Sequence, residues 1–164
     1  MSQAGVARVL FVCLGNICRS PTAHGVFEAL VKQRGLEHAI QIDSCGTGDW
    51  HIGHAPDRRA TAEAAKRGYD LSHLRARQVQ VRDFDDFDYI LAMDNQNLAD
   101  LKAMCPADFS GHLGLFLPFD PQAALQEVPD PYYGGDEGFT QVLDMVEAAS
   151  EGLLREICSA DTAR

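Results

Sequence analysis

The residues most able to do covalent chemistry lie near the start of the chain, in the segment 12–21, which reads VCLGNICRSP. Cys13 ends an apolar run, and Arg19 follows it after five intervening residues. A thiolate is a strong nucleophile, and the planar guanidinium group of arginine can bind two phosphoryl oxygens at once. The spacing therefore places a candidate nucleophile and a candidate anion clamp at the two ends of one loop.

The composition of this loop favours anion binding. Backbone N–H groups of a concave loop and of a helix N-terminus point into one space, and the helix dipole adds partial positive charge there. Gly15 permits close backbone approach, and Asn16 tolerates a left-handed conformation. These donors, together with Arg19, favour the thiolate form of Cys13. The residues expected to surround a bound anion are Leu14, Gly15, Asn16, Ile17, Cys18 and Ser20.

A simpler interpretation of Cys13 is a small apolar residue buried at the end of a strand. Packing alone does not explain why Arg19 follows at this spacing and why Ser20 and Pro21 then open a helix. A nucleotide-binding Walker A loop does not fit, because the segment has no Gly-Lys-Ser/Thr sequence. We therefore favour a nucleophilic cysteine in an anion-binding loop.

The elements that must position this loop alternate along the chain. Short apolar runs predict strands at residues 9–13, 40–45, 89–93 and 113–119. The predicted helices begin at the N-caps Ser20, Asp57 and Asn95, and a last helix follows an apolar stripe over residues 139–157. The second of these helices, over residues 58–67, ends before Gly68, and the third ends near Met104.

This alternation predicts a single α/β domain over residues 1–164, with a parallel sheet of about four strands and helices on both faces. In such sheets the ligand binds beyond the carboxyl ends of the strands. The loop that follows the first strand lies at that edge, so we expect the phosphate-binding loop there.

Composition narrows the functional class. A net charge of −10 argues against a nucleic-acid partner, because binding the phosphate backbone uses a basic excess. The N-terminal residues lack the pattern of a signal peptide, and no apolar run is long enough to cross a membrane. The five cysteines are scattered, which in a chain without a secretory signal favours reduced thiols. We expect a cytoplasmic protein that does not bind a membrane.

The remaining polar groups predict neither a metal nor a cofactor. His51 and His54 lack the further ligands of a zinc site, and we interpret them as solvated loop residues. The basic group on the second predicted helix is interpreted as a solvated face; its members are Arg58, Arg59, Lys66 and Arg67.

The sequence resembles the low molecular weight protein tyrosine phosphatases, whose signature combines a Cys-x5-Arg-Ser loop near the N-terminus with an Asp-Pro loop near the C-terminus. Both are present, the second as Asp130-Pro131-Tyr132-Tyr133-Gly134. The resemblance covers essentially the whole chain. It also includes Asp43-Ser44, Asp49-Trp50, Ala76-Arg77-Gln78 and the segment 87–91.

The resemblance assigns further roles. It makes Asp130 the general acid that protonates the leaving phenol and then the base that activates water. It places Trp50 and Tyr132 on the walls of the substrate cleft, where a deep aromatic slot would exclude phosphoserine. It makes Tyr132 and Tyr133 candidate phosphorylation sites. It further implies that Asn16, Ser44 and His73 form a hydrogen-bond network that supports the loop. The partners that the resemblance implies are phosphate or other oxyanions and a phosphotyrosine protein, for example a tyrosine kinase.

Two other functions remain open on the sequence. A thioredoxin-coupled arsenate reductase uses a similar loop, but the further cysteines of its relay are absent from residues 82–94. A non-enzymatic phosphotyrosine reader or redox sensor is disfavoured because Cys13, Arg19 and Asp130 are all intact. Cys18 shares the loop with Cys13, so we also expect it to capture an oxidised Cys13 as a disulfide.

Overall fold

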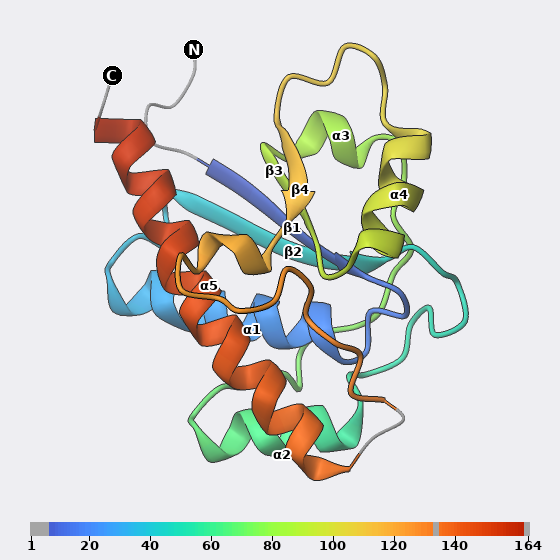
Figure 1. Ribbon diagram of the computed structural model, residues 1–164, viewed down its shortest axis with the longest axis vertical. Helices are drawn as coiled ribbons and strands as arrows, with labels where there is room; N and C mark the ends of the chain where they lie inside the picture. The colour runs from blue at the N-terminus through green and yellow to red at the C-terminus, as the bar shows by residue number, and fades with distance from the viewer. Residues whose placement is uncertain (1–6, 133–134, 163–164) are drawn as a thin grey trace.

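The chain folds around a four-stranded sheet, seen in a computed structural model that describes residues 7–132 and 135–162. The strands β1 (Ala7–Cys13), β2 (Ile40–Gly46), β3 (Tyr89–Ala92) and β4 (His112–Leu115) are parallel and lie in the order β2-β1-β3-β4. The helices are α1 (Arg19–Gln33), α2 (Arg58–Lys66), α3 (Asp83–Asp86), α4 (Asn95–Met104) and α5 (Asp136–Thr162), with the short 3-10 helix η1 (Leu117–Phe119). The predicted α/β fold with a four-stranded parallel sheet is confirmed (Figure 1).

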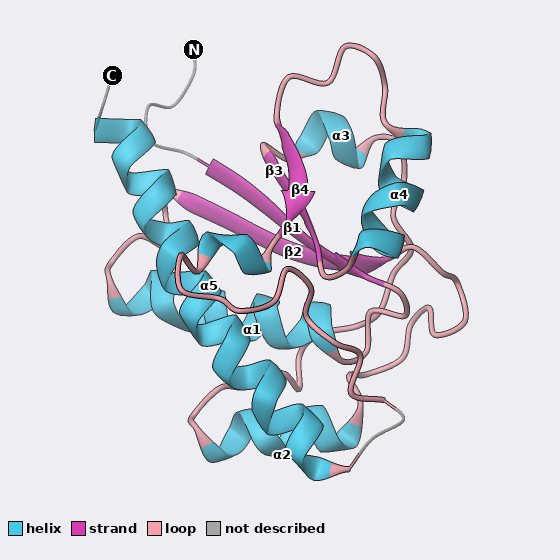
Figure 2. Cartoon of the chain, in the orientation of Figure 1, coloured by secondary structure: helices cyan, strands magenta, loops and turns pink. Residues whose placement is uncertain are grey.

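Helices cover both faces of the sheet, as Figure 2 shows. Alternate residues of β1 enter two different apolar clusters: Phe11 packs on the side of α1 and α5, and Val12 on the side of α3 and α4. The ring of Phe11 makes edge contacts with Phe27 at 5.7 Å and with Phe116 at 5.0 Å between centroids. A strand buried on both faces has a continuous apolar sequence, which explains why this run forms the centre of the sheet.

The fourth strand is shorter than the sequence predicted. It ends at Leu115, and Leu117–Phe119 forms η1 instead of continuing the strand. Pro118 has no N–H group to donate to a neighbouring strand. The backbone of Phe119 also lies so close to Gly152 of α5 that a Cβ there would lie 1.8 Å from the Phe119 carbonyl oxygen. Pro118 and this close packing explain the change from strand to turn.

Two of the three predicted N-caps were wrong by a small shift. Asp57 does cap α2, accepting hydrogen bonds from the N–H groups of Arg59 and Ala60. The cap of α4 is Asp94 rather than Asn95, because Asp94 forms a reciprocal capping box with Asn97. The short helix α3 was not predicted.

The start of α1 was also predicted two residues too late. The helix begins at Arg19, its N-cap position is Cys18, and no side chain caps it. Ser20 therefore lies inside the first turn, where its hydroxyl group is available for the site.

The loops at the carboxyl ends of β1, β2 and β3 lie next to one another. The N–H of Met93 donates to Val12 O at 3.1 Å, and the N–H of Val128 donates to Met93 O at 2.8 Å. These bonds attach the segment that precedes Asp130 to the carboxyl end of β3. A residue far along the chain is thereby brought beside the loop that follows Cys13.

Candidate active site

The loop between β1 and α1, residues 13–19 and called here the Cys13 loop, forms the floor of a pocket of about 350 Å³. This volume suits a small ligand. The pocket is lined by Cys13, Leu14, Gly15, Ile17, Cys18, Arg19, Trp50, His51, Asp130 and Tyr132. Predicted catalytic and substrate-binding residues from three separate segments thus line one cavity.

The backbone of the Cys13 loop is fastened to the end of β2. Thr47 N–H donates to Cys13 O, and Gly48 N–H donates to Leu14 O, each at 2.9 Å. The loop passes so close to Gly46 that a Cβ there would lie 2.6 Å from Leu14 O. Asn16 has a φ of 57°, in the left-handed region that the sequence predicted it would tolerate.

The thiol of Cys13 contacts the side chain of Ser20. Cys13 Sγ lies 3.0 Å from Ser20 Oγ, and the Asn16 amide donates to the same oxygen at 2.7 Å. Cys45 O lies 3.3 Å from Ser20 Oγ as a further acceptor. Because the hydroxyl accepts from Asn16, its single proton can be donated either to Cys45 O or to the nearer Cys13 sulfur, where it can stabilise negative charge. The N-cap role predicted for Ser20 is thus replaced by a contact with the nucleophile.

Arg19 is 3% exposed, and its guanidinium group lies at the base of the pocket. Its Nη1 donates to Asp94 Oδ2 at 2.7 Å and to Val128 O at 3.0 Å. Its Nη2 lies 3.7 Å from Asp130 Oδ2. Burial alone would lower the pKa of Arg19, but Cys13 and the hydrogen bond with Asp94 raise it. The group therefore stays charged beside the thiol.

Asp94 is a functional residue that sequence reasoning missed. Its Oδ1 accepts the N–H of Asn97 at the start of α4, while its Oδ2 accepts the Arg19 guanidinium. One carboxylate thus caps a helix and orients the anion clamp. The available signal was an acidic residue directly after the third strand, at the edge where ligands bind in parallel sheets.

Asp130 and Tyr132 form the opposite wall of the pocket. The side chain of Asp130 is 36% exposed, and its Oδ1 accepts the N–H of Tyr132 at 3.0 Å. Tyr132 and Trp50 are both exposed aromatics at the pocket, at 39% and 66%. The predicted candidate Tyr133 lies outside the described residues.

The expected support network of Asn16, Ser44 and His73 is only partly formed. Asn16 Oδ1 accepts the N–H of Arg77 at 3.0 Å. The hydroxyl of Ser44 lies 2.9 Å from Nδ1 of the buried His24 on α1. His73 is a correction: its half-exposed ring lies 3.3 Å from Glu28 on the surface of α1 and not in this network.

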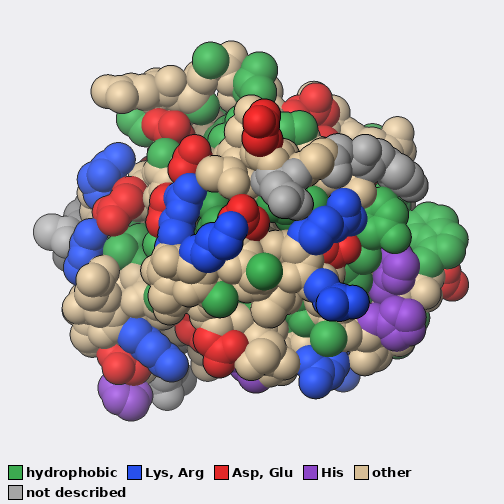
Figure 3. Space-filling view, turned by 90° about the horizontal axis from the view of Figure 1, so that it is seen from below, with side chains coloured by type: hydrophobic (Ala, Val, Ile, Leu, Met, Phe, Trp, Pro, Cys, Tyr) green, Lys and Arg blue, Asp and Glu red, His purple; other side chains and the backbone are tan. Residues whose placement is uncertain are grey.

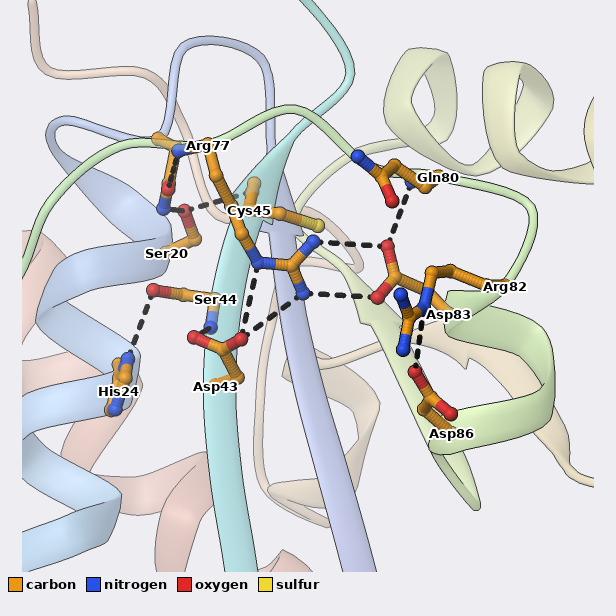
Figure 4. A network of polar contacts seen from close by, with 11 residues as sticks. Ser20, His24, Asp43, Ser44, Cys45, Arg77, Gln80, Arg82, Asp83 and Asp86 are labelled. Atoms are coloured by element: carbon orange, nitrogen blue, oxygen red, sulfur yellow. Dashed lines mark hydrogen bonds and ion pairs between the residues drawn. The ribbon is translucent and has the colours of Figure 1, made fainter. Parts of the chain in front are cut away.

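Arg77 is a second residue, after Asp94, whose role in holding the site was not predicted (Figure 4). Its guanidinium group lies between Asp43 on β2 and Asp83 on α3, with hydrogen bonds of 3.0 to 3.1 Å to both. Its backbone carbonyl also accepts the N–H of Gly46 at 2.8 Å. These contacts fix the backbone N–H that holds Asn16.

No group of three or more metal-ligating side chains occurs within residues 7–132 and 135–162. His51 and His54 lie near each other, with ring centroids 5.7 Å apart. Within the same described ranges, every helix is too short or too polar to cross a membrane.

The sequence and the fold match one family of known proteins. The family model described as low molecular weight phosphotyrosine protein phosphatase matches residues 8–162. A low molecular weight protein-tyrosine-phosphatase of Streptomyces coelicolor is 46% identical over 92% of this chain and 93% of the relative. The human low molecular weight phosphotyrosine protein phosphatase is 42% identical over 87% of this chain and 90% of its own length.

A solved structure gives the same result for the fold. The crystal structure of a protein tyrosine phosphatase from Entamoeba histolytica, with Hepes in its active site, superposes with a TM-score of 0.90. That protein is 39% identical, and the match covers 94% of this chain and 98% of the other. Because the family model, the relatives and the fold agree over nearly the whole length, the chain belongs to the low molecular weight phosphotyrosine protein phosphatase family.

Proposed function

We propose that this protein hydrolyses phosphotyrosine through a covalent phosphate on Cys13, with Arg19 as phosphate clamp and Asp130 as general acid and base. The observation that carries the proposal is the single pocket in which the Cys13 sulfur, the Arg19 guanidinium and the Asp130 carboxylate meet. A nucleophile, a phosphate-binding cation and a proton donor are what transfer of a phosphoryl group from an aryl ester needs.

The first step is attack of the Cys13 thiolate on phosphorus. A sulfur–phosphorus bond forms as the phosphorus–oxygen ester bond breaks, and protonated Asp130 gives its proton to the departing phenolic oxygen. The N–H groups of residues 14–19 and the guanidinium group of Arg19 hold the phosphoryl oxygens. Ser20 donates its hydroxyl proton toward the sulfur, at the observed 3.0 Å.

The second step returns the enzyme to its starting state. Asp130, now a carboxylate, removes a proton from water, and the water oxygen attacks phosphorus. The sulfur–phosphorus bond breaks, which releases inorganic phosphate and restores both the Cys13 thiolate and protonated Asp130. The Asp130 side chain reaches both the pocket and solvent, as this step needs.

The aromatic rim supports phosphotyrosine as the substrate. Trp50 and Tyr132 flank the pocket, so the ring of a phosphotyrosine can pack between them while its phosphate reaches Cys13. A phosphoserine side chain is too short for this position. We propose a phosphotyrosine-bearing protein as the partner, with a tyrosine kinase as one candidate, a cytoplasmic location, and residues 1–164 as one phosphatase domain.

The test is metal-free turnover of matched phosphotyrosine, phosphoserine and phosphothreonine peptides in the presence of a chelator, with and without vanadate. We expect hydrolysis of the phosphotyrosine peptide alone, inhibition by vanadate, and no turnover by Cys13→Ser, whose hydroxyl has no base to activate it. Substantial activity of Cys13→Ser would show that another group is the nucleophile. Binding of phosphotyrosine without turnover would favour a reader, and reduction of arsenate with thioredoxin would favour a reductase.

A further inference from the structure

The basic side chains on and next to α2 stay exposed or partly exposed, as the sequence predicted, but Arg59 and Arg67 also make specific contacts. Figure 3 shows Lys and Arg side chains interspersed with Asp and Glu on the face that carries α2. Arg67 pairs with Asp144 and Glu147 of α5. Arg59 contacts the other wall of the active site, through Tyr132.

From these contacts we infer that Arg59 is a positioning residue for the proposed general acid: it holds Tyr132, and thereby orients the carboxyl group of Asp130. The inference rests on the proposed function, because orientation of Asp130 matters only if this group transfers a proton.

Arg59 is first fixed in place by its own helix cap. Its Nε lies 3.2 Å from Oδ1 of Asp57, and its Nη2 lies 3.3 Å from Oδ2 of the same carboxylate. Asp57 also accepts the backbone N–H of Arg59 at 2.8 Å as the N-cap of α2. A guanidinium group that binds one carboxylate through two nitrogen atoms has little freedom to rotate.

The same guanidinium group then binds the Asp130 loop, defined here as residues 128–132. Its Nη2 donates to the carbonyl oxygen of Tyr132 at 3.0 Å. Its Cζ lies 5.4 Å from the centroid of the Tyr132 ring and 4.6 Å from that of Phe139 on α5. Both distances are within the range of cation–π attraction. Arg59 thus joins α2, the Asp130 loop and α5 at one point.

Tyr132 passes this constraint to the carboxyl group. Its backbone N–H donates to Asp130 Oδ1 at 3.0 Å, with only Pro131 between the two residues. Arg59 therefore binds the carbonyl group of Tyr132, and the N–H group of Tyr132 binds the Asp130 carboxylate. A shift of about 1 Å in a group that transfers a proton can reduce a rate substantially.

Arginine suits this position better than lysine. The planar fork can donate to the Asp57 carboxylate and the Tyr132 carbonyl while its faces meet aromatic rings, whereas an ammonium group is a single point charge. The hydrogen bond with Asp57 raises the pKa of Arg59. Burial opposes ionisation of Asp57, but hydrogen bonds from Arg59 outweigh it and lower the pKa of that carboxyl. The pair therefore stays ionised at neutral pH.

The test compares Arg59→Gln and Arg59→Lys with Arg58→Gln, which removes the same charge from an exposed neighbour on the same helix. We measure kcat/KM, which reports transfer of the phosphoryl group to Cys13, for aryl phosphates of graded leaving-group pKa. For basic leaving groups we expect Arg59→Gln to lower kcat/KM about 5- to 50-fold, less than loss of Asp130 itself. Activated leaving groups should lose less than about 2-fold, Arg59→Lys should recover only part of the rate, and Arg58→Gln should match wild type.

A double mutant separates positioning from other effects. In an Asp130→Asn background there is no carboxyl proton to orient, so the further change Arg59→Gln should have no effect on kcat/KM beyond about 2-fold. The same loss in both backgrounds would overturn the inference, as would equal loss for every leaving group, since either result places Arg59 in substrate binding or folding. Wild-type rates for Arg59→Gln would overturn it as well.

Limited proteolysis tests the docked loop without using activity. Chymotrypsin cleaves after aromatic residues, and cleavage after the exposed Trp50 serves as an internal reference. We expect cleavage after Tyr132 to be several-fold faster in Arg59→Gln than in wild type, relative to Trp50. If the proposed function failed, this difference would remain and turnover would not; if cleavage were unchanged while wild type hydrolysed phosphotyrosine, the inference alone would be wrong.

Discussion

The carboxylate of Asp94 lies 2.7 Å from Nη1 of Arg19, and the same carboxylate caps the helix that follows β3. The orientation of the phosphate clamp therefore depends on a helix that is remote from it in sequence. Because Arg19 is buried, its charge also needs a close counter-ion when no phosphate is bound.

Asp94→Asn should therefore reduce both oxyanion affinity and turnover while the cap is kept, because an asparagine amide still accepts the N–H of Asn97. A hydrogen bond to a charged group contributes about 1.5 to 3 kcal/mol, which corresponds to a loss of about 10- to 100-fold in kcat/KM. The measurements are kcat/KM for a phosphotyrosine peptide and the inhibition constant of vanadate. Asp100→Asn, on the same helix, is the control; equal effects of the two changes would contradict a specific role for Asp94.

Asp130→Asn should slow phosphotyrosine hydrolysis by about 10²- to 10⁴-fold, the usual contribution of a positioned general acid. Phosphate binding should survive, since the Cys13 loop provides it. The loss should be greatest for basic leaving groups, which need protonation, and much smaller for an activated aryl phosphate. The measurement is kcat/KM of wild type and mutant over a series of aryl phosphates with graded leaving-group pKa. An equal loss across the series would mean that Asp130 shapes the pocket and that another acid must be sought.

Cys18 should protect Cys13 from irreversible oxidation. Both thiols are buried and line the same pocket. Burial together with Asp57 raises the pKa of Cys18, so this thiol gives up its proton as its sulfur attacks the sulfenic acid. The S–S bond forms as the S–O bond of the sulfenic acid breaks, and water is released. After brief peroxide exposure, dithiol should restore activity to wild type but not to Cys18→Ser. Mass spectrometry should find a Cys13–Cys18 disulfide in the first and sulfinic acid at Cys13 in the second. Direct progress to sulfinic acid in wild type would rule out protection.

His24 should make folding stability depend on pH. Burial lowers the pKa of His24 from its ordinary 6.5, with Glu28 and Asp43 opposing the shift and His73 adding to it. The unfolded chain then binds a proton at pH values where the folded protein does not. Stability present above about pH 6.5 is lost as the pH falls toward the folded pKa, at up to about 1.4 kcal/mol per pH unit.

Urea unfolding from about pH 5 to about pH 8 measures this dependence. His24→Gln keeps a polar partner for Ser44, and its free energy of unfolding should fall less than that of wild type as the pH is lowered. Parallel stability curves for the two proteins would show that His24 does not cause the loss.

Gly46→Ala should distort the Cys13 loop, because the added Cβ would lie 2.6 Å from Leu14 O and 3.1 Å from Asn16 N. Overpacking of this kind costs about 1 to 3 kcal/mol of unfolding free energy. The free energy of unfolding measured in urea and the affinity for vanadate should both fall. Gly135→Ala is the control, since among the described residues, chain neighbours aside, no atom lies within 4 Å of the corresponding Cβ. Unchanged vanadate affinity in Gly46→Ala would mean that the loop tolerates the contact.

The strands, the long helices and the Cys13 loop could be predicted because their signals are local. The continuous apolar run of β1 and the Asp57 cap each occupy a few consecutive residues. The C-terminal half of the fourth predicted strand was wrong although Pro118 is a local signal against a strand. The packing of Phe119 against Gly152, which also ends the strand, joins residues that are distant in sequence and could not be predicted in this way.

The site follows the same rule. Cys13 and Arg19 share one loop, and their position at the pocket could be expected from it. The partners of Arg19 and Asn16, namely Asp94 and Arg77, come from other segments, and only the fold brings them together. The expected contact of His73 failed for the same reason, because nothing near it in sequence shows that Glu28 lies within reach.

The pairing of Cys13 with Gly46 in the ladder between β1 and β2 makes the nucleophile part of the sheet itself. Displacing it requires opening the centre of the sheet, which costs a large part of the free energy of unfolding. The Asp130 loop is anchored to the interior at Val128, whose N–H and carbonyl bond to Met93 and Arg19. Its outer part carries the exposed side chains of Asp130 and Tyr132 and can open at lower free energy. Amide hydrogen exchange at the two catalytic positions should therefore differ by orders of magnitude, with any motion for substrate entry confined to the side that carries the acid.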